Sequence, residues 1–488
     1  MDTATAPSAT TRGLAGQHVV VTGAGVSGRG CVRTLVALGA AVTVVDANEE
    51  NLARALSECP DAKGMTSDAA LGNVRDGTLR PDFVVTSPGW RPDSPVLVAF
   101  QQHGIEVIGD VELAWRLDRA GRFGSPRTWL AVTGTNGKTT TTGMLAEIMQ
   151  ADAQATGRRA EPAGNIGRSV FELLADSDRV DVLVVELSSF QLHWSTTLAP
   201  HVGVLLNVAG DHLDWHGSLE SYAAAKGKIL SGEVAVLGRD DAAVVQQADR
   251  LRATGKLAET AFAFTLGAPE HGEVGVERGR LVDNGVAGEV ADLGPATGIE
   301  PPGTAGLYDA AAAATAARAA GASARAVAAG LAAYSVDGHR GAVVARDGGV
   351  TYIDNSKATN PHAADAALSA ADSVVWIAGG QLKGADVHEV IAKHGDRLRA
   401  VVLVGQDRNI LAAALAENAP TVPVESIANT DPQGAMEEVA AAARRHAVAG
   451  DTVLLAPAAA SLDMYSGMAQ RGDMFAAAVA RTCASQNS

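Results

Sequence analysis

A glycine-rich segment near residue 135 carries the clearest chemical signal in the sequence. It reads Gly134-Thr135-Asn136-Gly137-Lys138-Thr139-Thr140 and lies between the hydrophobic stretch Trp129 to Thr133 and a stretch that favours a helix. Backbone N–H groups of such a loop can wrap a phosphate, while the lysine neutralises its charge and the Thr139 hydroxyl reaches a magnesium ion. Val132 replaces the first glycine of the full phosphate-loop pattern. The segment predicts a nucleotide phosphate site, and the alternative is a glycine turn without a ligand.

A second glycine loop lies close to the N-terminus. Gly23-Ala24-Gly25-Val26-Ser27-Gly28 has the GxGxxG spacing, and Asp46 ends the next hydrophobic stretch, Ala41 to Val45. This pattern is typical of a loop that binds the diphosphate of a nucleotide at a helix N-terminus. The spacing alone does not distinguish NAD from another nucleotide diphosphate, and a tight turn without a ligand is also possible.

Polar side chains follow two further hydrophobic stretches where strands should end. Glu186 closes Val182 to Glu186, and Asn207, Asp211 and His212 follow Val202 to Leu206. The carboxyl ends of parallel strands meet at one edge of a sheet, so these side chains should lie near the phosphate loop. A carboxylate there suits Mg²⁺, and a histidine could bind a metal or a phosphate, although a surface histidine is the simpler interpretation.

Two alternatives concern the residues after His212. His212, Asp214 and His216 could form a zinc set, but the oxygen-rich surroundings favour magnesium. Lys226 and Lys228, on the expected next helix, would ordinarily be solvated charges.

Elements that could position these residues alternate along the whole chain. Strand-like stretches alternate with helical ones, which predicts parallel sheets covered on both faces and an α/β fold class. We expect three domains: a Rossmann-like domain over 1–125, a central phosphate-loop ATPase-type domain over 126–336 and a Rossmann-like domain over 337–488. An alanine-rich helical tract from Ala310 to Ala333 should be interrupted at Gly321 and Gly330. The remaining expected strands are His18 to Thr22, Phe83 to Thr86, Ile105 to Ile108, Val374 to Ala378, Ala400 to Val404 and Thr452 to Ala456.

Composition excludes several classes of protein. A net charge of −16 would repel polyphosphate backbones, so nucleic acid is not an expected partner. No apolar run approaches the roughly 20 residues of a membrane helix, and Met1 to Arg12 lacks a secretory pattern. Three cysteines cannot form a disulfide framework. These features predict a cytoplasmic protein without membrane insertion, and we expect a monomer.

Taken together, the motifs resemble those of the Mur ligase family, and most closely its D-glutamate-adding members, over nearly the whole chain. The matching segments, besides the two glycine loops, are Ser87-Pro88-Gly89, Gly109-Asp110-Val111-Glu112-Leu113, Gly164-Asn165-Ile166-Gly167, Glu186-Leu187-Ser188-Ser189-Phe190-Gln191, Asp211-His212-Leu213-Asp214, His339-Arg340, Asp354-Asn355-Ser356-Lys357-Ala358-Thr359-Asn360, Ser461-Leu462-Asp463 and Arg471-Gly472.

The resemblance implies an ATP- and Mg²⁺-dependent ligase that joins D-glutamate to UDP-N-acetylmuramoyl-L-alanine through an acyl phosphate, in peptidoglycan precursor synthesis. It implies that the first domain holds uridine diphosphate rather than NAD. Implied catalytic residues are Lys138, His212, Lys226 and Lys357. Implied ATP contacts are Gly134 to Thr140, Arg340 and Asp354. Implied metal ligands are Thr139, Glu186, His212 and Lys226, the last as a carbamate. Implied substrate contacts are Val26, Ser27, Asp46, Ser87, Gly89, Asn165, His212, Thr359, Lys383, Ser461, Leu462 and Tyr465.

The chain also departs from the family pattern. Tyr308-Asp309-Ala310-Ala311-Ala312 stands where relatives carry His-Asn-x-x-Asn before the alanine-rich helix, so both amides expected to face the adenine are absent. The rival interpretations are a sister Mur ligase, a folate polyglutamate synthetase and a nucleotide-binding protein without ligase activity. A dehydrogenase would use the first glycine loop only and would leave the second unexplained.

Overall fold

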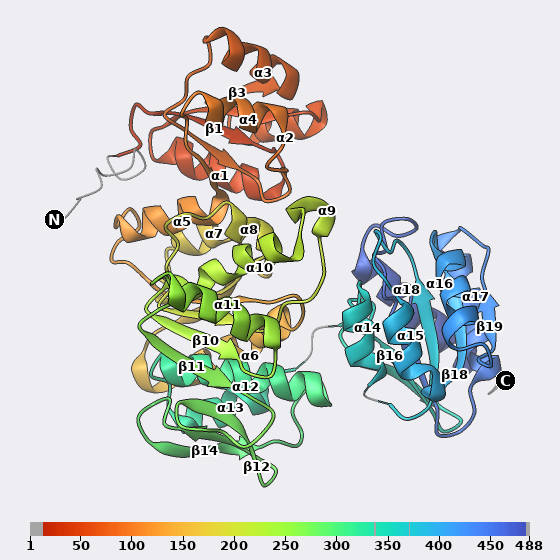
Figure 1. Ribbon diagram of the computed structural model, residues 1–488. Coiled ribbons are helices and arrows are strands. Elements are labelled where there is room, and N and C mark those ends of the chain that lie inside the picture. Colours follow the sequence, from red (N-terminus) through yellow and green to blue (C-terminus); the bar gives the residue numbers. More distant parts are fainter. Residues whose placement is uncertain (1–12, 336–337, 370, 485–488) are drawn as a thin grey trace. The chain divides into compact units, whose positions relative to one another are not determined.

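The computed structural model describes residues 13–335, 338–369 and 371–484 (Figure 1). The predictions made for Met1 to Arg12 and for a boundary at 336/337 concern residues outside these ranges. The chain forms two compact units. One comprises the described parts of Met1–Val208, His212–Pro295 and Asp309–Ala332, and the other those of Ala209–Asp211, Ala296–Tyr308 and Ala333–Ser488. Three separate sheets confirm the predicted α/β fold class.

The first sheet is fully parallel, with strand order β3-β2-β1-β4-β5. Valines of β1 alternate between two cores, with Val19 and Val21 on one face and Val20 on the other. This order places a topological switch between β1 and β4, where ligands of open α/β sheets bind. The strands are β1 His18–Thr22, β2 Ala41–Asp46, β3 Lys63–Thr66, β4 Phe83–Thr86 and β5 Val107–Gly109. The helices are α1 Val26–Ala37, α2 Glu49–Glu58, α3 Ser67–Asp76, α4 Pro95–Gln102 and α5 Asp110–Arg119.

The central sheet has the strand order β14-β13-β12-β11-β10-β9-β6-β8-β7. Strands β6 to β12 are parallel, and β12 to β14 add an antiparallel meander that the sequence analysis did not predict. The strands are β6 Thr128–Thr133, β7 Ala160–Gly164, β8 Val182–Glu186, β9 Val202–Leu205, β10 Val234–Gly238, β11 Thr260–Phe264, β12 Glu273–Glu277, β13 Arg280–Asn284 and β14 Val290–Pro295. The helices are α6 Lys138–Thr156, α7 Val170–Leu174, α8 Ser189–His193, α9 Leu213–His216, α10 Leu219–Gly227, α11 Ala242–Ala253, α12 Thr304–Ala319 and α13 Ala324–Ala333.

One prediction for the alanine-rich tract is wrong. The tract does break at Gly321, which has a φ of +91° between α12 and α13, but Gly330 lies inside α13. A Cβ at Gly330 would come within 2.4 Å of the Ile148 Cα on α6. Glycine therefore serves here to let two helices approach closely, which a single-sequence pattern does not distinguish from a helix break.

The third sheet has the strand order β15-β16-β20-β17-β18-β19, parallel except for β15. Alternate residues of β17 enter two cores: Val375 and Ile377 pack with α17 and α18, whereas Trp376 and Ala378 pack with α15 and α16. The strands are β15 Ala342–Asp347, β16 Val350–Asp354, β17 Val374–Gly379, β18 Leu398–Val404, β19 Val424–Ser426 and β20 Thr452–Leu455. The helices are α14 Pro361–Leu368, α15 His388–His394, α16 Arg408–Asn418, α17 Pro432–His446 and α18 Met468–Ala484.

Helix α5 is buried along nearly its whole length, between the first and the central sheet, beside α7 and α8 (Figure 1). Its Glu112 is fully buried and accepts hydrogen bonds from the backbone N–H groups of Thr196, Thr197 and Leu198, at 2.9–3.1 Å. The guanidinium of Arg116 also donates to Glu112 at 2.7 Å. One hydrophobic core runs through both sheets around this helix, so the first two domains form one unit.

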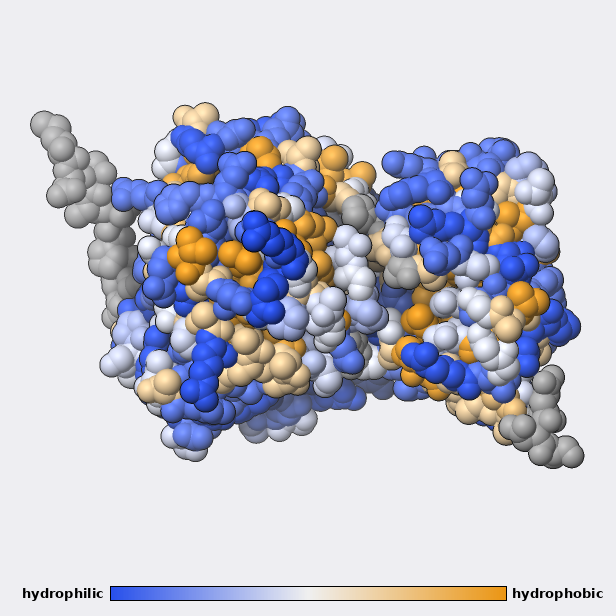
Figure 2. All heavy atoms as spheres, turned by 90° about the horizontal axis from the view of Figure 1, so that it is seen from below, coloured by the Kyte–Doolittle hydropathy of each residue, from blue (hydrophilic) through white to orange (hydrophobic). Residues whose placement is uncertain are grey.

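The surface is mixed in character. Figure 2 shows hydrophilic residues over much of one face, with hydrophobic residues in small groups among them. Within the described ranges, no helix is long and apolar enough to cross a membrane. The three cysteines are free thiols.

Replacing Glu112 by glutamine tests the buried carboxylate. Burial alone would raise the pKa of Glu112, but hydrogen bonds from Thr197 and Arg116 hold it below its ordinary value. A lowered carboxyl pKa stabilises the fold at neutral pH, and this stability is lost as the pH falls through the folded-state value. We expect Glu112→Gln to lower the free energy of unfolding, measured with denaturant, by about 2–5 kcal/mol near pH 7 and by less in acid. Glu58→Gln, at a partly exposed pair with Arg29, should cost under about 1 kcal/mol. Equal losses at the two sites would contradict the interpretation.

Asp110, two residues earlier on the same helix, should show the opposite dependence on pH. Burial raises its pKa to about 6, although the Val111 backbone N–H and the Ser27 hydroxyl donate to it. The native state then holds a proton that the unfolded chain has lost, so stability falls as the pH rises from about 4 to about 6. We expect Asp110→Asn to be neutral in acid and to stabilise near pH 7 by up to about 3 kcal/mol. Thermal unfolding at both pH values measures the difference, and a pH-independent effect would rule out this titration.

Candidate functional site

The first glycine loop is built at the switch between β1 and β4. The Ser87 hydroxyl, after β4, donates to the Gly23 carbonyl at 3.3 Å. A Cβ at Gly28 would lie 1.7 Å from the same carbonyl oxygen, so only glycine fits there. Helix α1 begins at Val26 without a side-chain cap and without acidic residues in its first turn. These uncapped N–H groups suit an anionic ligand.

The residues predicted to bind substrate near this loop differ in their surroundings. Both oxygens of Asp46 accept backbone hydrogen bonds, from Ala24 at 2.6 Å and from Asn48 at 2.8 Å. Asp46 therefore fixes the shape of the loop. Val26 is 77% exposed and Gly89 is exposed, so these two positions are open to a ligand, whereas Ser27 is half-buried and its hydroxyl donates to Asp110.

The second glycine loop joins β6 to α6 and is held by the end of β9. The backbone N–H groups of Thr135 and Asn136 donate to the Asn207 carbonyl and to its Oδ1, at 3.0 and 2.9 Å. The Asn207 amide returns a bond to the Asn136 carbonyl at 3.2 Å. The sequence analysis placed Asn207 at this edge of the sheet but gave it no role in holding the loop. Asn207 lies two residues after the end of β9, the strand next to β6.

Two lysines converge on the carbonyls of this loop. Lys138 Nζ donates to the Gly134 and Thr135 carbonyls at 3.1 and 2.8 Å, and Lys226 Nζ donates to the Gly134 carbonyl at 2.6 Å. Lys226 is almost fully buried, so it is not a solvated charge, and it lies 4.7 Å over the Tyr222 ring. The Tyr222 hydroxyl lies 3.1 Å from the Thr135 hydroxyl. Tyr222 is a residue that the sequence analysis missed.

Glu186 provides a carboxylate that fits a magnesium ion. It ends β8, next to β6, and is 1% exposed. Its Oε1 accepts from the Asn165 amide at 2.8 Å, whereas its buried Oε2 has no hydrogen-bond partner among the described residues. A buried carboxylate oxygen without a partner is costly unless a cation or water satisfies it. Mg²⁺ in nucleotide sites is held by one or two carboxylates plus phosphates, and Thr139 stands at the start of α6 in the same loop.

His212 lies at the N-terminal end of α9, in a left-handed conformation with a φ of 52°. Its ring packs 4.7 Å from Phe190. His216 instead approaches the Ser189 hydroxyl at 3.0 Å. The described part of the chain contains no cluster of three or more His, Cys, Asp or Glu side chains placed to hold a metal. The zinc alternative therefore gains no support from the geometry.

Asp309 occupies the position where the family pattern has an amide. Asp309 is 5% exposed, and its carboxylate lies against the phosphate loop. A Cβ added at Gly137 would come within 2.2 Å of its Oδ1. Gly137 has a φ of +79°, so the loop requires glycine there for its conformation as well. The departure thus places a carboxylate beside the loop.

In the other unit, the segment after β16 gathers several predicted residues. Asp354 accepts from the Ser356 backbone N–H at 2.9 Å, and its Oδ2 lies 2.6 Å from His339 Nδ1. The Lys357 N–H donates to the His339 carbonyl at 3.1 Å. His339, which the sequence analysis gave no role, contacts the Asp354 carboxylate through its ring and the Lys357 backbone through its carbonyl. Arg340, which follows it, is half-buried.

The predicted amino-acid contacts lie after neighbouring strands of this sheet. Lys383 follows β17 and is exposed, with a φ of 53°, while Ser461 follows β20 and is buried. Leu462 is 64% exposed. Tyr465 packs in the core, and burial raises its pKa to about 12. The geometry thus supports Tyr465 as a packing residue more than as a ligand contact.

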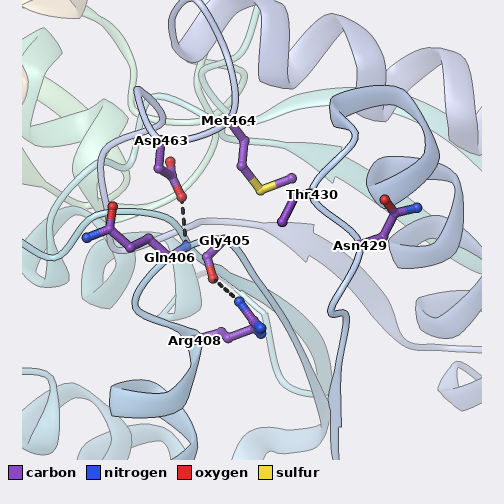
Figure 3. Close-up of a pocket in the computed structure, with 7 residues that line it drawn as sticks. All are labelled: Gly405, Gln406, Arg408, Asn429, Thr430, Asp463 and Met464. Atoms are coloured by element: carbon purple, nitrogen blue, oxygen red, sulfur yellow. Dashed lines mark hydrogen bonds between the residues drawn. The ribbon is translucent and has the colours of Figure 1, made fainter.

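A separate hollow of about 260 Å³ lies at the carboxyl ends of β18 and β19 (Figure 3). Asp463 accepts from the Gln406 N–H at 2.8 Å, and Arg408 donates to the Gly405 carbonyl at 3.0 Å. Its other lining residues are Asn429, Thr430 and Met464. No residue predicted to bind substrate lines this hollow.

Comparison with known families assigns the chain in three parts. Residues 17–109 match the Mur ligase MurD-like N-terminal domain, residues 132–268 the Mur ligase middle domain, and residues 339–459 the Mur ligase glutamate ligase domain.

Curated relatives match over nearly their whole length. The UDP-N-acetylmuramoylalanine–D-glutamate ligase of Corynebacterium diphtheriae is 53% identical over 468 residues, covering 96% of both chains. The ligases with the same name from Thermobifida fusca and Mycolicibacterium smegmatis are 48% and 45% identical, covering 95% of this chain and 98% and 96% of theirs.

Solved structures share the fold at low identity. The UDP-N-acetylmuramate-alanine ligase MurC from Thermotoga maritima gives a TM-score of 0.55 at 18% identity, covering 96% of this chain and 100% of that one. MurF from Acinetobacter baumannii gives 0.54 at 16% identity, covering 94% and 93%.

Glu186→Gln tests whether the partnerless oxygen binds the metal. The amide can keep the contact with Asn165 but supplies no anionic oxygen. We expect Mg²⁺ affinity to weaken by at least about 10-fold, measured by calorimetric titration in the presence of a non-hydrolysable ATP analogue. Glu161→Gln on the neighbouring strand β7, where the carboxylate pairs with Arg159, is the matched control and should leave the affinity unchanged. Unchanged affinity in Glu186→Gln would remove this residue from the metal site.

Proposed function

The chain belongs to the Mur ligase family, and we propose that it joins D-glutamate to UDP-N-acetylmuramoyl-L-alanine, with ATP and Mg²⁺, in cytoplasmic peptidoglycan precursor synthesis. The observation that carries the ATP-dependent chemistry is the pairing of the phosphate loop with the buried, partly unsatisfied carboxylate of Glu186 on the adjacent strand. The specific substrates rest on the 53% identity to a ligase of that name over 96% of both chains.

In this proposal the first two domains bind the two nucleotides. Uridine diphosphate occupies the loop after β1, with contacts from Val26, Ser27, Ser87 and Gly89, while Asp46 keeps the loop in shape. Asn165, bonded to Glu186, contacts the muramoyl part of the substrate. We place the domain boundaries at 125/126 and 336/337.

ATP phosphates occupy the loop Gly134 to Thr140. Lys138 must then exchange its carbonyl partners for phosphate oxygens, which a flexible ammonium can do. Thr139, Glu186, His212 and Lys226 are the proposed metal ligands, Lys226 as its carbamate. The bound metal ion neutralises phosphate charge.

The third domain supplies residues for both halves of the reaction. Arg340 and Asp354 bind ATP, and Lys357 neutralises the charge of the transferred phosphoryl group. Thr359, Lys383, Ser461 and Leu462 bind glutamate, with Tyr465 packed beneath them. A lysine with hydroxyl groups suits a carboxylate side chain, because charge-assisted hydrogen bonds are strong.

The chemistry follows from the weakness of a carboxylate as an electrophile. The alanyl carboxylate attacks the γ-phosphate of ATP, which releases ADP and leaves an acyl phosphate. The glutamate amine then attacks the acyl carbon, loses a proton and displaces phosphate, which yields the amide. The protein contributes positioning and charge neutralisation through Lys138 and Lys357, as in phosphoryl transfer generally.

The test is phosphate release by the purified protein with ATP, Mg²⁺ and UDP-N-acetylmuramoyl-L-alanine, together with D-glutamate, L-glutamate or no amino acid. We expect rapid release and a product of the ligated mass only with D-glutamate. Activity with L-glutamate alone would change the proposed specificity, and no product with either would contradict the proposed function.

Two lysine variants control this assay. Lys138→Ala should lower the rate by at least about 100-fold, because it removes charge stabilisation at the transferring phosphate. Lys256→Ala, at an exposed position after α11, should leave it unchanged.

A further inference from the structure

One arginine in the third domain is fully buried, and its hydrogen bonds to described residues go to a serine and to backbone carbonyls rather than to an acidic side chain. Arg471, on α18, is 1% exposed. Its Nε donates to the Ser356 hydroxyl at 2.9 Å and its Nη2 to the Ser356 carbonyl at 2.7 Å. Its Nη1 donates to the carbonyls of Gly379 at 3.3 Å and Ala459 at 3.1 Å. One guanidinium thus connects three separate segments of the chain.

These three segments lie at the carboxyl ends of the adjacent strands β16, β20 and β17. Ser356 lies between Asp354 and Lys357, Ala459 lies two residues before Ser461, and Gly379 ends β17 just before the loop that leads to Lys383. The first segment carries the phosphoryl-handling residues, and the other two carry glutamate contacts. Arg471 therefore contacts the segments that carry both sets of proposed ligand-binding residues. It is not itself one of the residues proposed to bind a ligand.

The chemistry of the side chain explains why an arginine stands there. Burial lowers the pKa of Arg471 to about 10, so it stays a cation at neutral pH. A planar guanidinium has five donors in a fixed fork and can hold several acceptors at set angles. A lysine ammonium would keep the charge but could not span three segments. The Ser356 hydroxyl also donates to the Met468 carbonyl at 2.8 Å, which ties the first segment to α18 a second time.

We propose that Arg471 is a positioning residue that keeps the phosphoryl-handling segment in register with the glutamate-binding segments. This inference rests on the proposed function. In the intact site, the amine attacks the acyl phosphate and forms an amide, phosphate and a proton. When the segments slip, water attacks instead, which regenerates the carboxylate and releases phosphate without product. Arg471 thus couples ATP consumption to ligation.

The experiment measures the amounts of phosphate and ligated product formed by the full-length enzyme carrying Arg471→Lys. Wild type should form the two in equal amounts. We expect product formation in Arg471→Lys to fall on the order of 10- to 100-fold and the ratio of phosphate to product to rise by at least about 2-fold. A purely structural role would lower the amount of active enzyme, reduce both rates together and leave the ratio unchanged.

Matched variants keep the result decisive. Arg399→Lys makes the same change at the amino end of the same sheet, where Arg399 pairs with Asp451 at 2.7 Å, and should keep the wild-type ratio. Ser356→Ala removes the hydroxyl that accepts from Arg471 Nε and should also raise the ratio of phosphate to product. This variant tests the proposal even if Arg471→Lys folds poorly. A ratio unchanged in both Arg471→Lys and Ser356→Ala contradicts the role of Arg471 while leaving the proposed function intact. A wild type that makes no glutamate adduct contradicts the proposed function itself.

Discussion

All three sheets place the carboxyl ends of their parallel strands along one edge, and there the backbone loses its ladder partners. Loops at that edge expose N–H and C=O groups that must be satisfied by side chains or by a ligand. At this edge of each sheet, one polar side chain makes at least two hydrogen bonds to such groups. Asp46 holds the first glycine loop, Asn207 the phosphate loop and Arg471 the segments of the third domain.

Local chemistry made much of this predictable from the sequence. The glycine loops are contiguous, so their spacing alone indicates a turn that leads into a helix N-terminus. Short apolar runs predicted the strands β1, β4 and β8 with the bounds that the structure has. Glu186 could be placed at the sheet edge because it ends one of these runs. The roles given to individual residues at the site stay a prediction.

What could not be predicted depends on contacts between distant parts of the chain. Arg471 meets Ser356 across 115 residues, and Tyr222 meets Thr135 across 87. Arg471 belongs to a segment that matches the family pattern, but nothing local in the sequence indicates its contact with Ser356, and Tyr222 has no local pattern that separates it from an ordinary helical residue. Gly330 was mistaken for a helix break because its partner, Ile148, lies on another helix. The meander β12–β14 was missed because its strands are short and charged residues interrupt their apolar runs.

The buried carboxylates of α5 have a consequence for how this protein can be divided. Glu112 is satisfied by backbone groups of Thr196 to Leu198, and Asp118 by Arg127 and by the Trp129 indole, all beyond the predicted end of the first domain. A fragment that stops near residue 125 would leave Glu112 with Arg116 and Asp118 with Arg119, but it would remove their other donors and open one side of a shared core to water. The first domain is thus not expected to be stable as an isolated fragment. Recombination between relatives should succeed more readily at sites that keep residues 13–208 together.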